Sequence, residues 1–172
     1  MLRLFKFAFA GIFTATALTV SVAPRTAPAA ESTVPSQEVL DRAAIQNLIV
    51  KYGMALDTLD ADLYASVFAP DAEFTFGGNT YHGRAEIRKI VTDIKERRAS
   101  QPPADPPVKM YHAITNTLIE FVNDHEAHHH SYWQTIRGPS SGPFTVGGMG
   151  MYVDTIVKRD GQWLIQKREI VQ

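Results

Sequence analysis

The sequence predicts an α+β domain in which helices cover one face of a curved antiparallel sheet. Two observations lead to this prediction. Apolar residues recur at three- and four-residue steps in the first part of the chain, whereas strand-like runs separated by turn residues fill the part after residue 108. The 172 residues, 45 % of them hydrophobic and 20 % charged, have the length and composition of one ordinary globular domain.

The N-terminus has the three-part pattern of a secretory signal. Arg3 and Lys6 precede an apolar run at residues 7–22, and the small-x-small sequence Ala27-Pro-Ala29 follows. We therefore predict that residues 1–30 are a cleaved signal peptide, that residues 31–35 are a linker, and that the protein is periplasmic or secreted. The apolar run is shorter than the roughly 20 residues that cross a bilayer, which disfavours the alternative of an uncleaved anchor.

Three helices are predicted after the linker. The first begins near Ser36 and carries one apolar stripe, formed by Ile45, Leu48, Ile49, Tyr52, Leu56 and Leu59. Asp60 can cap a second, short helix that ends near Phe68, before Pro70. A third helix is predicted at residues 84–98. The stretch at residues 101–107 cannot continue it, because it holds four prolines, which lack an N–H donor and clash with the preceding turn.

Six strand-like runs complete the domain. Residues 71–76 and 79–82 flank a Gly77-Gly78 turn. Four longer runs follow at residues 109–121, 125–137, 144–158 and 162–171. Turn residues separate them, namely Asn123-Asp124, a Gly/Pro/Ser loop at 138–143, and Asp160-Gly161. This succession predicts a long antiparallel meander at the end of the chain.

Composition and charge exclude several classes of function. The chain has no cysteine, so thiol catalysis, thiolate zinc sites and iron–sulfur clusters are excluded. Removal of the predicted signal, which holds three of the 17 basic residues, leaves 14 basic residues against 18 acidic ones. A mildly acidic domain is a poor candidate for nucleic acid binding, because that requires clustered Lys and Arg. We expect no nucleic acid partner, and no membrane contact after the signal is removed.

Six short motifs occur in a fixed order: Tyr52-Gly-Met-Ala-Leu-Asp57, Phe68-Ala-Pro-Asp71-Ala, Gly83-Arg84, His112-Ala-Ile-Thr-Asn116, Gly150-Met-Tyr152-Val-Asp154, and Asp160-Gly-Gln-Trp163 followed by Arg168. Through them the chain, over residues 36–172, resembles the SnoaL-like group of the nuclear transport factor 2-like superfamily, which includes scytalone dehydratase and bile acid 7α-dehydratase. The resemblance implies a cone-shaped fold, in which a strongly bent antiparallel sheet packs on three helices and a pocket lies at the open end. Because such cones host many enzymes and also binding proteins, the site residues must select the function.

The resemblance implies that Asp57 and His112 form a catalytic pair. In the dehydratases of this group a helix-borne aspartate pairs with a strand-borne histidine, and these two residues stand at the matching positions. Asp57 would accept a hydrogen bond from one imidazole nitrogen, and the other nitrogen would remove a proton next to an activating group. The alternatives are a hydrogen-bonded core histidine and an aspartate that ends or caps a helix.

Other residues are weaker candidates. Tyr52 matches a tyrosine that some of these lyases place five residues before the aspartate, where its phenol could polarise a carbonyl or assist a leaving hydroxyl. Because five residues advance a helix by about 140° net, Tyr52 and Asp57 do not share a face, and core packing is an equal alternative. Arg168 stands where related lyases have an arginine for an anionic substrate group; a solvated edge or a carboxylate partner is its alternative. The further candidate substrate-binding residues are Asp154, Tyr152 and Phe76.

Two sequence features argue against specific chemistries. In scytalone dehydratase a second histidine and a serine complete the site, and the corresponding regions here hold Arg137 and Gly150, which disfavours scytalone-type dehydration. The run from His125 to His130 contains H-E-x-x-H, but that motif binds zinc only on a helix. A turn precedes this run and strand-like residues follow it, so we expect a solvated strand end, with His128 and His130 on one face, and no metal site.

The leading hypothesis is a cofactor-independent, dehydratase-like lyase that acts on a hydroxylated cyclic or aromatic small molecule. His112 is its base, Asp57 orients the base, and Tyr52 is a candidate electrophile. A ketosteroid-type isomerase would use the same residues. The alternative from another class is a non-catalytic domain that binds a small molecule or serves assembly. Relatives often dimerise through the sheet face, so the resemblance also implies a homodimer.

Overall fold

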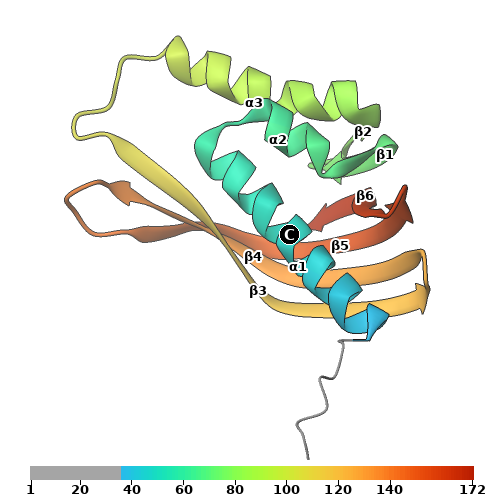
Figure 1. The fold of residues 1–172 in the computed structure, drawn as a ribbon. Helices are drawn as coiled ribbons and strands as arrows, with labels where there is room; N and C mark the ends of the chain where they lie inside the picture. Colours follow the sequence, from blue (N-terminus) through green and yellow to red (C-terminus); the bar gives the residue numbers. More distant parts are fainter. Residues whose placement is uncertain (1–35) are drawn as a thin grey trace, which may run out of the picture. The chain divides into compact units, whose positions relative to one another are not determined.

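A computed structural model describes residues 36–172 of the chain, which form one compact unit. The predicted signal peptide and linker, residues 1–35, lie outside the described residues. Three helices and six strands follow one another as α1 (Gln37–Thr58), α2 (Ala61–Ser66), β1 (Phe68–Phe76), β2 (Asn79–His82), α3 (Gly83–Ala99), β3 (Val108–Asn123), β4 (Glu126–Pro139), β5 (Thr145–Arg159) and β6 (Gln162–Val171). Helix α1 crosses one face of the sheet, and α2 and α3 lie beyond it (Figure 1).

The six strands form one curled, open sheet in the order β2-β1-β6-β5-β4-β3. The predicted α+β class and the antiparallel meander from β3 to β6 are confirmed. One pair differs from the expected antiparallel sheet, because β1 runs parallel to β6. Turn residues indicate how consecutive strands pair, but they carry no information on how β1 meets the last strand of the chain.

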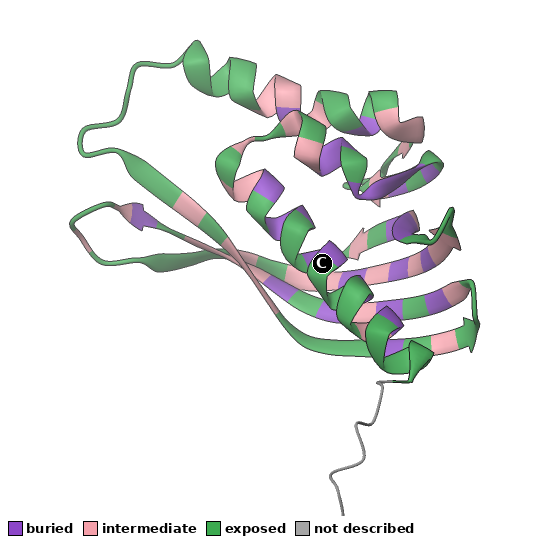
Figure 2. Cartoon of the chain, viewed as in Figure 1, coloured by how far each residue is buried: buried purple, intermediate pink, exposed green. Residues whose placement is uncertain are grey.

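Helix α1 provides much of the core. The predicted stripe is confirmed for Ile45, Leu48, Ile49 and Tyr52, each of which is buried. Figure 2 shows this buried side of α1 turned toward the sheet and the opposite side exposed. The helix ends when Leu59 adopts a left-handed conformation, with φ of 54°. This conformation lets backbone N–H groups beyond the helix satisfy its last carbonyls.

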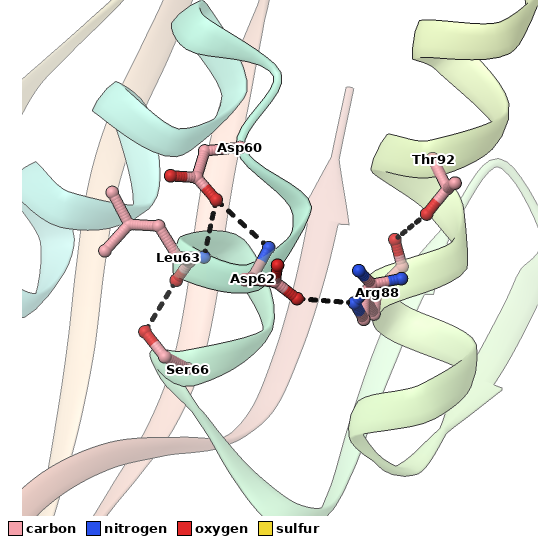
Figure 3. A network of polar contacts seen from close by, with 6 residues as sticks. All are labelled: Asp60, Asp62, Leu63, Ser66, Arg88 and Thr92. Atoms are coloured by element: carbon pink, nitrogen blue, oxygen red, sulfur yellow. Dashed lines mark hydrogen bonds and ion pairs between the residues drawn. The ribbon is translucent and has the colours of Figure 1, made fainter.

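Polar contacts fix α1 and α2 to their neighbours. Asp60 caps α2 as predicted, since its Oδ1 accepts from the backbone N–H groups of Asp62 and Leu63 at 3.1 and 2.9 Å (Figure 3). The Arg88 side chain of α3 donates to the Asp62 carboxylate at 2.7 Å and thereby links the two helices. None of the helices in residues 36–172 is long and apolar enough to cross a membrane.

A bulge in β3 reverses which side chains face the helices. Asn116 has a φ of 53°, and the register with β4 shifts between Thr115 and Leu118. Before the bulge, the even-numbered His112 faces α1, whereas after it the odd-numbered Ile119 is buried. Simple alternation over residues 109–121 could not predict this change, because one extra residue inverts the two faces of a strand.

Candidate active site

The structure brings Asp57 and His112 into contact. Oδ1 of Asp57, in the last turn of α1, lies 2.7 Å from Nδ1 of His112 in β3, and the same oxygen accepts the backbone N–H of His112 at 2.9 Å. A carboxylate only accepts hydrogen bonds, so in the neutral ring Nδ1 carries the proton. Nε2 then keeps a lone pair and makes no hydrogen bond to any described residue. This is the arrangement that a general base requires.

The pair is partly shielded from water. The side chains of His112 and Asp57 are 10 % and 20 % exposed. Asp57 belongs to the C-terminal turn of α1, where backbone carbonyls give a negative partial charge. Both that charge and the Asp57 carboxylate favour the imidazolium that forms when His112 takes up a proton.

A cavity of about 340 Å³ lies beside the pair, between α1 and β3. Its lining is mainly apolar, and Gln46 and Thr117 are the polar groups other than Asp57 and His112. Gly53 lets the helix and the strand approach closely here, because a Cβ at this position would lie 3.3 Å from Cδ1 of Ile114. The cavity therefore provides a site of small-molecule size next to the imidazole.

Tyr52 points away from this cavity and into the core. It is buried, and its ring packs on Tyr64 and Tyr152 with centroids 5.2 and 5.4 Å apart. The guanidinium carbon of Arg168 lies 4.0 Å from the Tyr52 ring centre. Burial raises the pKa of the Tyr64 and Tyr152 phenols well above the ordinary value, so both stay protonated.

Asp154 and Arg168, two of the candidate substrate-binding residues, form a buried ion pair. Arg168 donates from Nε to Oδ1 of Asp154 at 2.7 Å and from Nη2 to Oδ2 at 2.5 Å, and neither side chain is exposed. The third candidate, Tyr152, stacks on the guanidinium from the side opposite Tyr52, at 4.2 Å. Burial by itself would raise the pKa of the Asp154 carboxyl, but the charge and hydrogen bonds of Arg168, with a hydrogen bond from His129, hold it below the usual value.

His129 is the residue of this network that the sequence reasoning missed. Its Nδ1 lies 2.6 Å from Oδ2 of Asp154, and its side chain is fully buried. The expected strand is confirmed, and it exposes His128 while His129 faces the interior. Strand alternation could have revealed this inward position once His128 and His130 had been placed on the opposite face.

The remaining candidates lie apart from the Asp57–His112 pair. Phe76 is 42 % exposed and lines a separate hollow between β1, β2 and α3. Within residues 36–172, no three histidine or acidic side chains converge in a way that could hold a metal ion. The acid–base pair and its cavity are thus the arrangement that can perform proton transfer.

Comparison with protein families identifies this arrangement. The model of the SnoaL-like domain matches residues 37–169, so the chain belongs to the SnoaL-like family. A comparison with curated proteins finds no match.

Solved structures share the fold. A protein of unknown function from Mycobacterium tuberculosis is 28 % identical, with a TM-score of 0.65 over 78 % of this chain and 72 % of that one. A putative scytalone dehydratase from Novosphingobium aromaticivorans is 26 % identical, with a TM-score of 0.63 over 78 % and 85 % of the two chains. A protein from Catenulispora acidiphila, solved in complex with S-DNPA, is 25 % identical, with a TM-score of 0.63 over 77 % and 92 %.

Proposed function

We propose that the protein is a cofactor-independent lyase that eliminates water from a hydroxylated cyclic or aromatic small molecule. The observation that carries the proposal is the 2.7 Å contact between Asp57 and Nδ1 of His112, which leaves Nε2 unbonded at an apolar cavity. Membership of the SnoaL-like family and similarity to a putative scytalone dehydratase support a reaction of this class. The small-molecule complex of the Catenulispora acidiphila protein supports a ligand of similar kind.

The proposed reaction needs one base and one returning proton. Nε2 of His112 takes a proton from the carbon next to an activating group, and the electron pair of that C–H bond forms the new double bond as the C–O bond breaks. The imidazolium then returns its proton to the departing hydroxide, which leaves as water. Asp57 holds the ring in the required tautomer and offsets its transient charge. General acid–base help of this kind contributes about 10²- to 10⁴-fold, so the substrate must already carry an acidic proton.

We assign Tyr52 and the Arg168 network a positioning role. Tyr52 belongs to α1 five residues before Asp57, and its ring rests on Arg168, whose charge is already paired with Asp154. This stacking fixes the rotation of α1 against the sheet and thereby the direction of the Asp57 carboxylate. The role of electrophile would require the buried Tyr52 hydroxyl to reach the cavity.

A panel of hydroxylated aromatic and steroidal compounds tests the proposal. We expect the wild-type protein to release water from at least one of them, detected as a dehydrated product by mass spectrometry, and His112→Gln to be slower by about 10²-fold or more. Thr135→Val is the matched control, because Thr135 lies opposite His112 in the β3–β4 pair without contacting Asp57. A product of unchanged mass would favour the isomerase, and bound but unconverted compounds would favour the binding domain.

We also propose export and a homodimer. The signal-like sequence at residues 1–30 supports export to the periplasm or beyond, and N-terminal sequencing of the native protein tests it, since an intact Met1 would contradict it. Exposed apolar side chains on the face of the sheet away from α1, among them Leu118, Tyr132 and Met149, support a dimer. A monomeric mass in light scattering at micromolar concentration would contradict the dimer.

A further inference from the structure

Two guanidinium groups line a second hollow, at the end of the sheet beyond α1. Its volume is about 450 Å³, and it lies between the last turn of α3, the proline-rich loop after that helix and the paired ends of β3 and β4. Arg98 and Arg137 supply its charges, and Pro102, Pro103 and Met110 are among its apolar walls. Among the described residues no acidic side chain lines it. A hollow with this lining favours an anion that carries an apolar body.

The hollow opens on the face of the sheet that carries His112. Arg137 lies directly opposite Met110 in the β3–β4 pair, and its Nη2 is 3.4 Å from the Met110 sulfur. Met110 and His112 are two residues apart on one strand, so both project from the same face, about 7 Å from each other. Figure 2 shows that the sheet beyond α1 is largely exposed on this side. A molecule held at Arg137 can therefore extend toward His112.

The charges of these two arginines are not neutralised by the protein. Within residues 36–172 neither Arg98 nor Arg137 forms an ion pair, whereas Arg88, Arg159 and Arg168 each pair with an aspartate. Arg98 lies in the last turn of α3, where any cation is favoured by the helix dipole. That explanation applies equally to Arg97, which lines a different hollow, and it does not apply to Arg137 in a strand.

The walls of the hollow are held in place. The backbone N–H of Ser140 donates to the carbonyl of Pro107 at 3.2 Å, which ties the loop after β4 to the proline-rich loop. Gly138 packs so closely on the chain at Pro143 that a Cβ there would lie 2.7 Å from its carbonyl oxygen. The backbone next to Arg137 is thus fixed on both sides. Arginines on a fixed frame lose less conformational freedom when they bind a ligand.

We propose that Arg98 and Arg137 bind the carboxylate of a small, flat, otherwise apolar acid. Guanidinium groups match the planar carboxylate with paired hydrogen bonds, and the proline and methionine side chains accept the apolar body. This inference rests on the proposed lyase function in one respect, because it assigns the bound acid as the substrate. The carboxylate then lies about 7 Å from the base, so the reacting carbon is about one ring away from it.

The test compares 2-naphthoate with its neutral counterpart 2-naphthamide in calorimetric titrations of the protein. We expect wild type to bind the acid at least tenfold more tightly than the amide, and Arg98→Gln and Arg137→Gln each to weaken the acid about tenfold while leaving the amide unchanged. Arg97→Gln is the matched control, since it removes the same charge from the same helix turn without touching the hollow. We expect it to change neither affinity.

Several results would overturn the proposal. Equal affinities for acid and amide, no binding of the acid, or equal losses in Arg97→Gln and Arg98→Gln would each exclude a carboxylate site here. The lyase function is read separately, because His112→Gln should abolish turnover and retain naphthoate binding. Acid binding without any turnover therefore rejects the lyase alone, and turnover of neutral compounds without acid binding rejects the carboxylate site alone. Melting curves of the four variants check that these substitutions leave the fold intact.

Discussion

Substitution of Asp154 by asparagine separates a structural role of the buried network from a substrate-binding role. The change leaves the Arg168 guanidinium fully buried without its counter-ion, and it weakens the partner of His129. Removal of one member of a buried ion pair costs about 3–5 kcal/mol. A domain of roughly 140 residues has an unfolding entropy of about 0.3 kcal/mol/K, so we expect the melting temperature to fall by about 10–17 °C.

The assay is thermal unfolding followed by calorimetry, with Asp71→Asn as the control. Asp71 also pairs with an arginine, Arg159, but both side chains are well exposed, so this change should cost less than about 1 kcal/mol. The double variant Asp154→Leu with Arg168→Met removes both charges and should recover more than half of the loss. If Asp154→Asn costs no more than Asp71→Asn, the network is not the structural element described above, and a site role for Arg168 regains support.

The pH dependence of stability gives the same experiment a second readout. The pKa of the Asp154 carboxyl is held below its usual value in the folded protein, despite the opposing effect of burial. Its contribution to stability is therefore complete above about pH 4, where the unfolded carboxyl is ionised, and is lost as the pH falls through the lower, folded pKa. Wild type should lose more stability on acidification below about pH 4 than Asp154→Asn. A parallel loss in both proteins would contradict this assignment.

Three further substitutions test other parts of the fold. Asp41→Ala removes the acceptor of the Trp163 indole N–H at 2.8 Å, so we expect a loss of about 1–3 kcal/mol and a shift of tryptophan fluorescence; unchanged stability would contradict the role of Asp41 as a buried tie. Gly53→Val inserts a branched side chain where even a Cβ meets Ile114 at 3.3 Å, and NMR should show His112 losing its contact with Asp57, which Gly53→Ser should largely keep. Asp60→Ala removes the cap of α2 and should cost about 1 kcal/mol in chemical denaturation, with no loss speaking against the cap.

The sequence predicted the fold well where local patterns determine structure. The apolar stripe of α1, the Asp60 cap and the hairpin turns depend on neighbouring residues, and the structure confirms them. The parallel pairing of β1 with β6 and the bulge at Asn116 depend on contacts between distant segments, so no local pattern indicated them. Local periodicity is blind to such choices because they follow from packing of the whole sheet.

The candidate site was predictable in part. The resemblance selected Asp57 and His112, which the structure places in contact, but it also grouped Arg168 and Asp154 with the substrate. Their mutual pairing in the interior could not be derived from strand alternation, which fixes the face of a residue and not its partner. His129 was overlooked because its neighbours drew attention as metal ligands, although alternation placed it on the opposite face.

The tautomer of the His112 ring tests the central claim most directly. Nitrogen-15 NMR distinguishes protonated from unprotonated ring nitrogens, and His112→Gln assigns the signals. We expect Nδ1 protonated and Nε2 unprotonated in wild type, the same tautomer in Asp57→Asn, whose amide oxygen can accept both hydrogen bonds, and a mixture in Asp57→Ala. A wild-type ring protonated at Nε2, or a ring that Asp57→Ala leaves unchanged, would contradict the proposed base.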